Sequence, residues 1–80
     1  MKEITTFEEI MVGDTVIADV DINKQLRKGI RCRVIELDTE YHEEDGEDWE
    51  VLYIKVDAKL KDGSFAWISN EDEGCITVFR

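Results

Sequence analysis

The amino-acid sequence predicts a mainly β protein that forms one domain over residues 1–80. A chain of 80 residues with 42% hydrophobic content has room for one modest core. Val, Ile and aromatic residues, which favour strands, supply much of that content. Apolar and polar side chains alternate from Thr15 to Ile22, as in a half-buried strand. Asp62-Gly63 favours a tight hairpin, because Gly accepts the positive φ that such a turn needs.

Residues 1–12 are predicted to form a short N-terminal helical turn. Thr6 and Glu9 have the spacing of a capping box, in which each side chain reaches a backbone N–H of the first turn. A helix here would place three apolar side chains on one side, where they can cover the open end of a sheet: Phe7, Ile10 and Met11.

Five strands are predicted to follow, over residues 15–22, 30–37, 49–60, 65–69 and 75–79. In the second strand the apolar residues change parity after Val34, which predicts a bulge or a sharp bend. The third strand is apolar on both sides, as expected of a central strand. Residues 70–74 are short and polar and predict a single 3₁₀ turn before the last strand.

The segment Glu36–Glu50 carries nine carboxylates in fifteen residues and no Lys or Arg. Within it, residues 38–48 are predicted to be a solvated acidic loop between the second and third strands. Half of the ten Lys and Arg residues lie just before it, within 24–33, so the charge is polarised along the chain. Arg31 and Arg33 are expected to pair with the third strand or its flanking acids, and a second contact of this basic stretch with an acidic partner or with RNA is the alternative.

The order of these elements resembles the SH3-like small barrel. The resemblance covers residues 11–79 and depends on Val12-Gly13-Asp14-Thr15-Val16, which looks like the "GDxV" opening of such barrels, on the Asp62-Gly63 hairpin and on the turn at Ser69–Asp72. It implies a closed five-stranded barrel, and closure would explain a bent second strand. The aromatic stretch, paired tryptophans and proline with which SH3 domains bind proline-rich peptides are missing, so that activity is not carried over.

Tudor-like and chromo-like relatives of this barrel bind methylated lysine in an aromatic cage. In this chain such a cage would have to be assembled from Tyr41, Trp49, Tyr53, Phe65 and Trp67. We interpret these residues as core and rim instead, because aromatic side chains supply much of the apolar area of a small domain.

No set of side chains predicts catalysis, so the protein is interpreted as a non-enzyme. His42 has no neighbouring nucleophile to activate. Residues 43–50 place a Gly among carboxylates but lack the alternating ligands of an EF-hand, so neither a metal nor another cofactor is expected. Cys32 and Cys75 lack metal-ligand spacing and are expected to be reduced thiols packed in strands.

The formal net charge of −10 repels nucleic acid and anionic membranes and attracts basic proteins. Direct nucleic-acid binding and membrane binding are therefore not expected. The N-terminal residues do not resemble a signal peptide, and the chain has no apolar run long enough to span a bilayer. We expect a cytoplasmic protein.

The leading hypothesis is an interaction protein that presents an acidic surface to a basic one, with nucleic-acid-binding or defence proteins as the expected partners. Its small size, acidity and compact β-fold resemble the proteins that bacteriophages make against host enzymes, which implies an inhibitor or nucleic-acid mimic. The acids would imitate phosphates and the aromatics would anchor the contact. The candidate binding residues are Glu40, Tyr41, Glu43, Glu44, Asp45, Glu47, Asp48, Trp49 and Glu50.

Two alternatives remain open. The first is an SH3-like or Tudor-like adaptor that binds a basic peptide through its aromatic face, in which case Tyr53 and Trp67 would matter more than the acids. The second is an accessory subunit that adds a strand to a larger assembly. Neither the identity of the partner nor the oligomeric state follows from the sequence.

Overall fold

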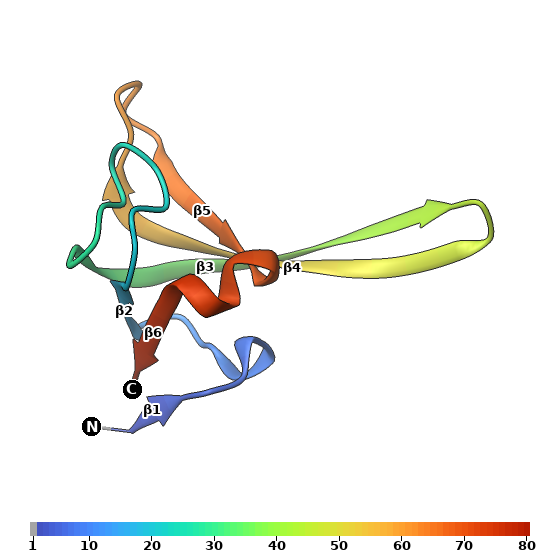
Figure 1. Cartoon of the computed structure of the whole chain (residues 1–80), viewed down its shortest axis with the longest axis horizontal. Coiled ribbons are helices and arrows are strands. Elements are labelled where there is room, and N and C mark those ends of the chain that lie inside the picture. The colour runs from blue at the N-terminus through green and yellow to red at the C-terminus, as the bar shows by residue number, and fades with distance from the viewer. Residues whose placement is uncertain (1) are drawn as a thin grey trace.

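The computed structural model describes residues 2–80 and contains one six-stranded antiparallel sheet with two 3₁₀ helices (Figure 1). The elements are β1 (Glu3–Ile4), η1 (Phe7–Glu9), β2 (Thr15–Ala18), β3 (Arg31–Glu44), β4 (Glu47–Lys59), β5 (Phe65–Ser69), η2 (Asn70–Cys75) and β6 (Ile76–Phe79). The spatial order of the strands is β1-β6-β2-β3-β4-β5. No pairing within residues 2–80 joins the edge strands β1 and β5, so the sheet is open.

The prediction of a mainly β protein is confirmed, and β5 and η2 lie where a strand and a 3₁₀ turn were predicted. The sheet has six strands rather than five, because Ile4 of β1 lies opposite Val78 of β6. β2 is shorter than predicted and ends at Ala18, which leaves Val20 exposed. The chain leaves the sheet here because the side chain of Asn23 accepts hydrogen bonds from the backbone N–H groups of Gln25 and Leu26, forming a loop.

The helical turn predicted for residues 1–12 is corrected to the short strand β1 followed by η1; Met1 lies outside the described residues. The predicted capping box does not form. The side chain of Thr6 makes no cap hydrogen bond, and its carbonyl instead accepts one from the N–H of Glu9. Phe7 and Ile10 are buried as predicted, but Met11 is 56% exposed. A single 3₁₀ turn is too short to bring all three side chains to one side.

One hydrophobic core joins all six strands with η1 and the loop after β2. Its members are Ile4, Phe7, Ile10, Val16, Leu26, Cys32, Val34, Ile54, Val56, Ala66, Ile68 and Val78. Residues from both edge strands enter this single cluster, so the sheet curves around it. Leu26 is 1% exposed although it lies in the polar segment that the sequence marks as a loop.

The predicted bulge in β3 is confirmed, because the register with β4 shifts between Val34 and Glu36. Before the bulge, Cys32 and Val34 face the core. Beyond it, Leu37 lies opposite the buried Ile54, so the core side has moved to the odd-numbered residues. Glu36 and the even-numbered residues that follow therefore face outward.

The acidic loop predicted for residues 38–48 is wrong, because these residues form the outer half of a long hairpin. β3 continues to Glu44 and β4 begins at Glu47, with Asp45-Gly46 as the turn. Both turn residues have positive φ, 52° at Asp45 and 83° at Gly46, as in the primed turns that join antiparallel strands. Negative charge therefore did not prevent strand pairing, and Asp-Gly marked this turn as it marked the one at Asp62-Gly63.

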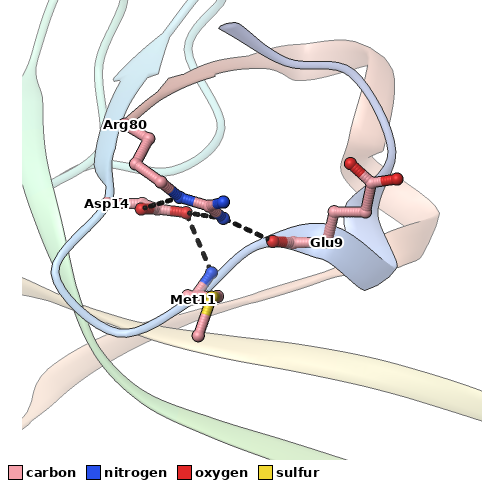
Figure 2. A network of polar contacts seen from close by, with 4 residues as sticks. All are labelled: Glu9, Met11, Asp14 and Arg80. Carbon is pink, nitrogen blue, oxygen red and sulfur yellow. Dashed lines mark hydrogen bonds and ion pairs between the residues drawn. The ribbon is translucent and has the colours of Figure 1, made fainter. Parts of the chain in front are cut away.

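A buried carboxylate ties the start of β2 to the last residue of the chain (Figure 2). Asp14 is 4% exposed and accepts hydrogen bonds from Arg80 Nε at 3.1 Å and from the backbone N–H of Met11 at 2.9 Å. Arg80 also donates to the carbonyl of Glu9 at 2.7 Å. Gly13, with a φ of 98°, provides the reversal that brings Asp14 to this position. The network holds the N-terminal segment against β2 and β6.

Candidate functional site: the acidic arm

The outer half of the β3–β4 hairpin, residues 38–53, projects from the rest of the molecule (Figure 1). We call this segment the acidic arm. It carries eight of the carboxylates singled out in the sequence and no Lys or Arg. β2 pairs with β3 only as far as Arg33, and β5 reaches β4 no further out than Tyr53. Beyond these points the arm is a two-stranded ribbon, a structure that is marginally stable in water by itself.

The register divides the side chains of the arm between two faces. The outer face carries Asp38, Glu40, His42 and Glu44 from β3 and Glu47, Trp49, Val51 and Tyr53 from β4. The inner face carries Thr39, Tyr41, Glu43, Asp48, Glu50 and Leu52. All nine predicted binding residues therefore lie on one projecting ribbon, with Asp45 in the turn, but the ribbon presents them on opposite sides.

Like charges lie directly opposite one another at the end of the arm. Glu43 lies opposite Asp48 and Glu44 lies opposite Glu47. Such pairs destabilise a hairpin. Within the arm, His42 Nε2 lies 3.3 Å from a carboxylate oxygen of Glu40. This contact is an ion pair only when His42 is protonated. The arm therefore carries repulsion that its own side chains do not neutralise.

Three aromatic groups are exposed on the arm. The ring of His42 stacks on Trp49, with 5.5 Å between ring centroids and 13° between planes. Tyr41 is 78% exposed and Trp49 is 44% exposed. Together with Glu43, Asp48 and Glu50 they line an open hollow of about 450 Å³. The stacked pair was not predicted from the sequence. Recognising Asp45-Gly46 as a turn would have predicted it, because residues 42 and 49 are equally far from that turn and so lie opposite each other.

The root of the arm has a second group of aromatic side chains. Tyr53 and Trp67 meet edge to face with 6.4 Å between centroids. Lys55 Nζ lies 5.5 Å from the ring centroid of Trp67 and 5.9 Å from that of Phe65. Trp67 is 41% exposed on the outer face, so it is a surface residue rather than part of the core. Tyr41, opposite Glu50, is further out along the arm, so the five candidate cage residues do not form one cluster.

The negative charge at the root acts on Tyr53. Partial removal from water raises the pKa of its hydroxyl, and the nearby carboxylates of Glu40, Glu71 and Asp38 raise it further. The outer face at the root thus combines aromatic rings with a negative potential.

Side chains cover backbone donors on both edges of the arm near its root. The N–H of Thr39 donates to its neighbour Asp38 at 2.8 Å, and the N–H of Leu52 donates to Asn70 Oδ1 at 3.3 Å. These bonds occupy groups that an added strand would need. The faces of the arm are therefore more accessible for recognition than its edges.

Within the described chain, the basic residues that precede the arm do not make the ion pairs that were expected from the sequence. Arg27 lies 4.0 Å from Asp21, but the side chains of Arg31 and Arg33 form no ion pair within 4.0 Å among residues 2–80. Asp57 of β4 accepts a hydrogen bond from the backbone N–H of Arg33 instead. The expected side-chain pairing with the third strand is thus absent from the described part of the chain.

Both cysteines are free thiols. Cys32 is buried, and burial, with a smaller effect from the charge of Asp57, raises its pKa to about 11. Cys75 ends η2 rather than lying in a strand. No group of three or more His, Cys, Asp or Glu side chains in residues 2–80 is placed to hold a metal ion, and no helix there is long and apolar enough to cross a membrane.

Comparisons with family models, with curated proteins and with solved structures found no match to this chain.

Proposed function

We propose that the protein is a non-enzymatic interaction protein whose acidic arm inserts into the nucleic-acid-binding groove of a basic protein and inhibits it by occupying that groove. The supporting observation is the arm itself, a projecting ribbon rich in carboxylates that contains no Lys or Arg to pair with them. Charge of one sign on a protruding element favours association with a surface of the opposite sign.

The spacing of the carboxylates supports imitation of a nucleic acid. A strand rise of about 3.4 Å per residue makes the paired part of the arm roughly 24 Å long. The seven carboxylates of this paired part then lie at about one per 3.4 Å. One strand of duplex DNA carries about one charge per 3.4 Å. The arm therefore approaches the linear charge density of a single nucleic-acid strand, and its exposed aromatics can serve as anchors.

The repulsion at the end of the arm is a further argument. A hairpin selected for stability alone would place opposite charges across from one another. Here Glu43 and Asp48, and Glu44 and Glu47, are opposed instead. Departures of this kind from local stability are expected at functional sites, and a basic groove would relieve the repulsion on binding.

We extend the proposal to the type of fold and to the kind of protein that is inhibited. The curved sheet around one core is compatible with an SH3-like body to which β1 adds an edge strand, although the sheet is open. An inhibitor of the kind that bacteriophages direct at cytoplasmic host proteins would fit the size and acidity of the chain.

A charge-reversal variant tests the proposed function. Glu43, Glu44, Glu47 and Asp48 are changed to Lys, and Asp45-Gly46 is kept because its positive φ values would strain a Lys. Wild type and variant are used as bait in a lysate of the source organism at low and high salt, and captured proteins are tested for elution by single-stranded DNA. We expect DNA-displaceable capture by the wild type, weakened more than about tenfold by the reversal and by high salt.

A matched control carries the same four changes of charge away from the arm, at Glu3, Glu8, Glu9 and Glu73, which are all exposed. It should retain more capture than the arm variant. Equal loss in both variants would mean that net charge, not the arm, drives binding. Capture that resists both salt and reversal would favour the accessory subunit that pairs a strand.

A further inference from the structure

A cation already lies on the aromatic group at the root of the acidic arm. The ammonium of Lys55 lies 5.5 Å from the centroid of Trp67 and 5.9 Å from that of Phe65, within the range of cation–π attraction. Tyr53 completes the group by meeting Trp67 edge to face. We call Tyr53, Phe65 and Trp67 the aromatic seat. Since Trp67 is 41% exposed, the seat is open to a cation from outside.

Lys55 occupies the seat although a carboxylate lies directly across from it. Glu36 is its cross-strand neighbour, yet no ion pair within 4.0 Å joins the two among residues 2–80. The bulge between Val34 and Glu36 is what turns Glu36 to this outer face. The ammonium of Lys55 thus lies on the rings of the seat, and the carboxylate of Glu36 beside it is not paired with that ammonium.

Further carboxylates surround the seat. Asp38, opposite Tyr53 in the register, and Glu40 and Glu71 all lie close enough to act on its hydroxyl. Aromatic faces flanked by carboxylates suit a planar cation that can stack on a ring and donate two parallel hydrogen bonds to a carboxylate at once. An arginine guanidinium has this geometry and is more weakly hydrated than the ammonium of lysine.

We propose that the aromatic seat binds an arginine side chain of the basic partner and that Lys55 holds its place in the free protein. The flexible stem of Lys55 then turns toward Glu36, while the guanidinium stacks on Trp67 and pairs with Asp38 or Glu40. This inference rests on the proposed function, because it requires a basic partner that binds the outer face. It adds that the root of the arm selects arginine on that partner.

The test uses labelled hexa-arginine and hexa-lysine peptides with the full chain, and measures binding by fluorescence anisotropy. Lys55→Ala empties the seat, and Lys59→Ala removes the same charge from an exposed position of the same strand. We expect Lys55→Ala to bind hexa-arginine about threefold more tightly than Lys59→Ala does, with little difference between them for hexa-lysine. Equal affinity of the two variants for hexa-arginine would overturn the proposal.

Trp67→Ala provides an independent measurement. It should weaken hexa-arginine binding about fivefold, and in the wild type the indole N–H signal of Trp67 should shift on titration. Its fold is checked by circular dichroism. Wild-type affinity in this variant would also overturn the seat. If the seat fails while the arm reversal abolishes partner capture, the proposed function stands without it; if Trp67→Ala weakens binding and the arm reversal does not, the arm proposal fails alone.

Discussion

Asp14 is a residue whose ionisation is controlled by the fold. Burial is the largest influence on its carboxyl and raises its pKa, but the hydrogen bonds from Arg80 and from the N–H of Met11, with the charge of Arg80, together outweigh burial. The pKa therefore lies below its usual value of 3.8. A carboxyl whose pKa is lower in the folded than in the unfolded state stabilises the folded state when it is ionised.

Asp14→Asn should lower the free energy of unfolding at pH 7 by about 1–3 kcal/mol, because it removes a charged hydrogen-bond acceptor from Arg80. The stabilisation by Asp14 is complete above about pH 4 and is lost as the pH falls through the lower pKa of the folded state. Urea unfolding between pH 2 and pH 7 should thus show the deficit of the variant shrinking below about pH 4. Glu8→Gln, at an exposed neighbouring position, is the control and should not reproduce this pattern.

The β3–β4 hairpin is the element that joins the hydrophobic core to the proposed binding surface. The half of the hairpin nearest the body supplies core residues, up to Val34 on β3 and from Ile54 onward on β4. Residues 41–50 pair only with one another, and the cross-strand pairs next to the turn are acids. Cross-strand pairs of like charge weaken a hairpin, so the arm should be the first part of the sheet to open.

Neutralising one acid of each opposed pair should therefore stabilise the arm. Glu43→Gln with Glu44→Gln is expected to raise the Tm by about 1–4 °C at low salt and by less at high salt. The arm amides should also exchange with deuterium more slowly than in the wild type. The control, Glu8→Gln with Glu9→Gln, removes two charges outside the arm, and an equal gain there would point to net charge instead. Partner capture should weaken in the arm variant despite its higher stability.

At the scale of the whole molecule, the body and the arm are separable. The core cluster gathers residues from all six strands, and between Thr39 and Leu52 only Val51 is buried. The two chain ends are joined, since Lys2 and Arg80 exchange backbone hydrogen bonds of 2.8 and 3.2 Å. The body is therefore held together by contacts of its own, and the arm adds Val51 and the partly buried Leu52 at its root.

Replacement of residues 41–50 by Asn-Gly should leave the body folded, because Glu40 and Val51 lie directly opposite in the register as a hydrogen-bonded pair, which suits a two-residue turn, and the buried Val51 is kept. We expect cooperative thermal unfolding with a Tm within about 10 °C of the wild type. Capture of the basic partner should be lost. Failure of the shortened chain to unfold cooperatively would show that the arm is part of the folding unit.

The local rules of the sequence predicted the strand type, the bulge after Val34, the short strand β5 and the 3₁₀ turn. They failed where tertiary context decided. Leu26 lies in a loop among polar neighbours, so only its packing into the core cluster shows that it is buried. The candidate binding residues were chosen mainly for their charge. Their division between two faces follows from the pairing of β3 with β4, which was not predicted because this segment was expected to be a loop.

The sequence by itself determined that this chain would be a small acidic β protein, because composition and alternation act locally. It also contained Asp45-Gly46, the turn that joins the two strands of the acidic hairpin. The tertiary structure alone decided that this hairpin would project as an arm, since β2 and β5 stop short of it. It also decided that Glu36 would face Lys55 beside the aromatic seat, because one extra residue at the bulge reverses which side chains point outward.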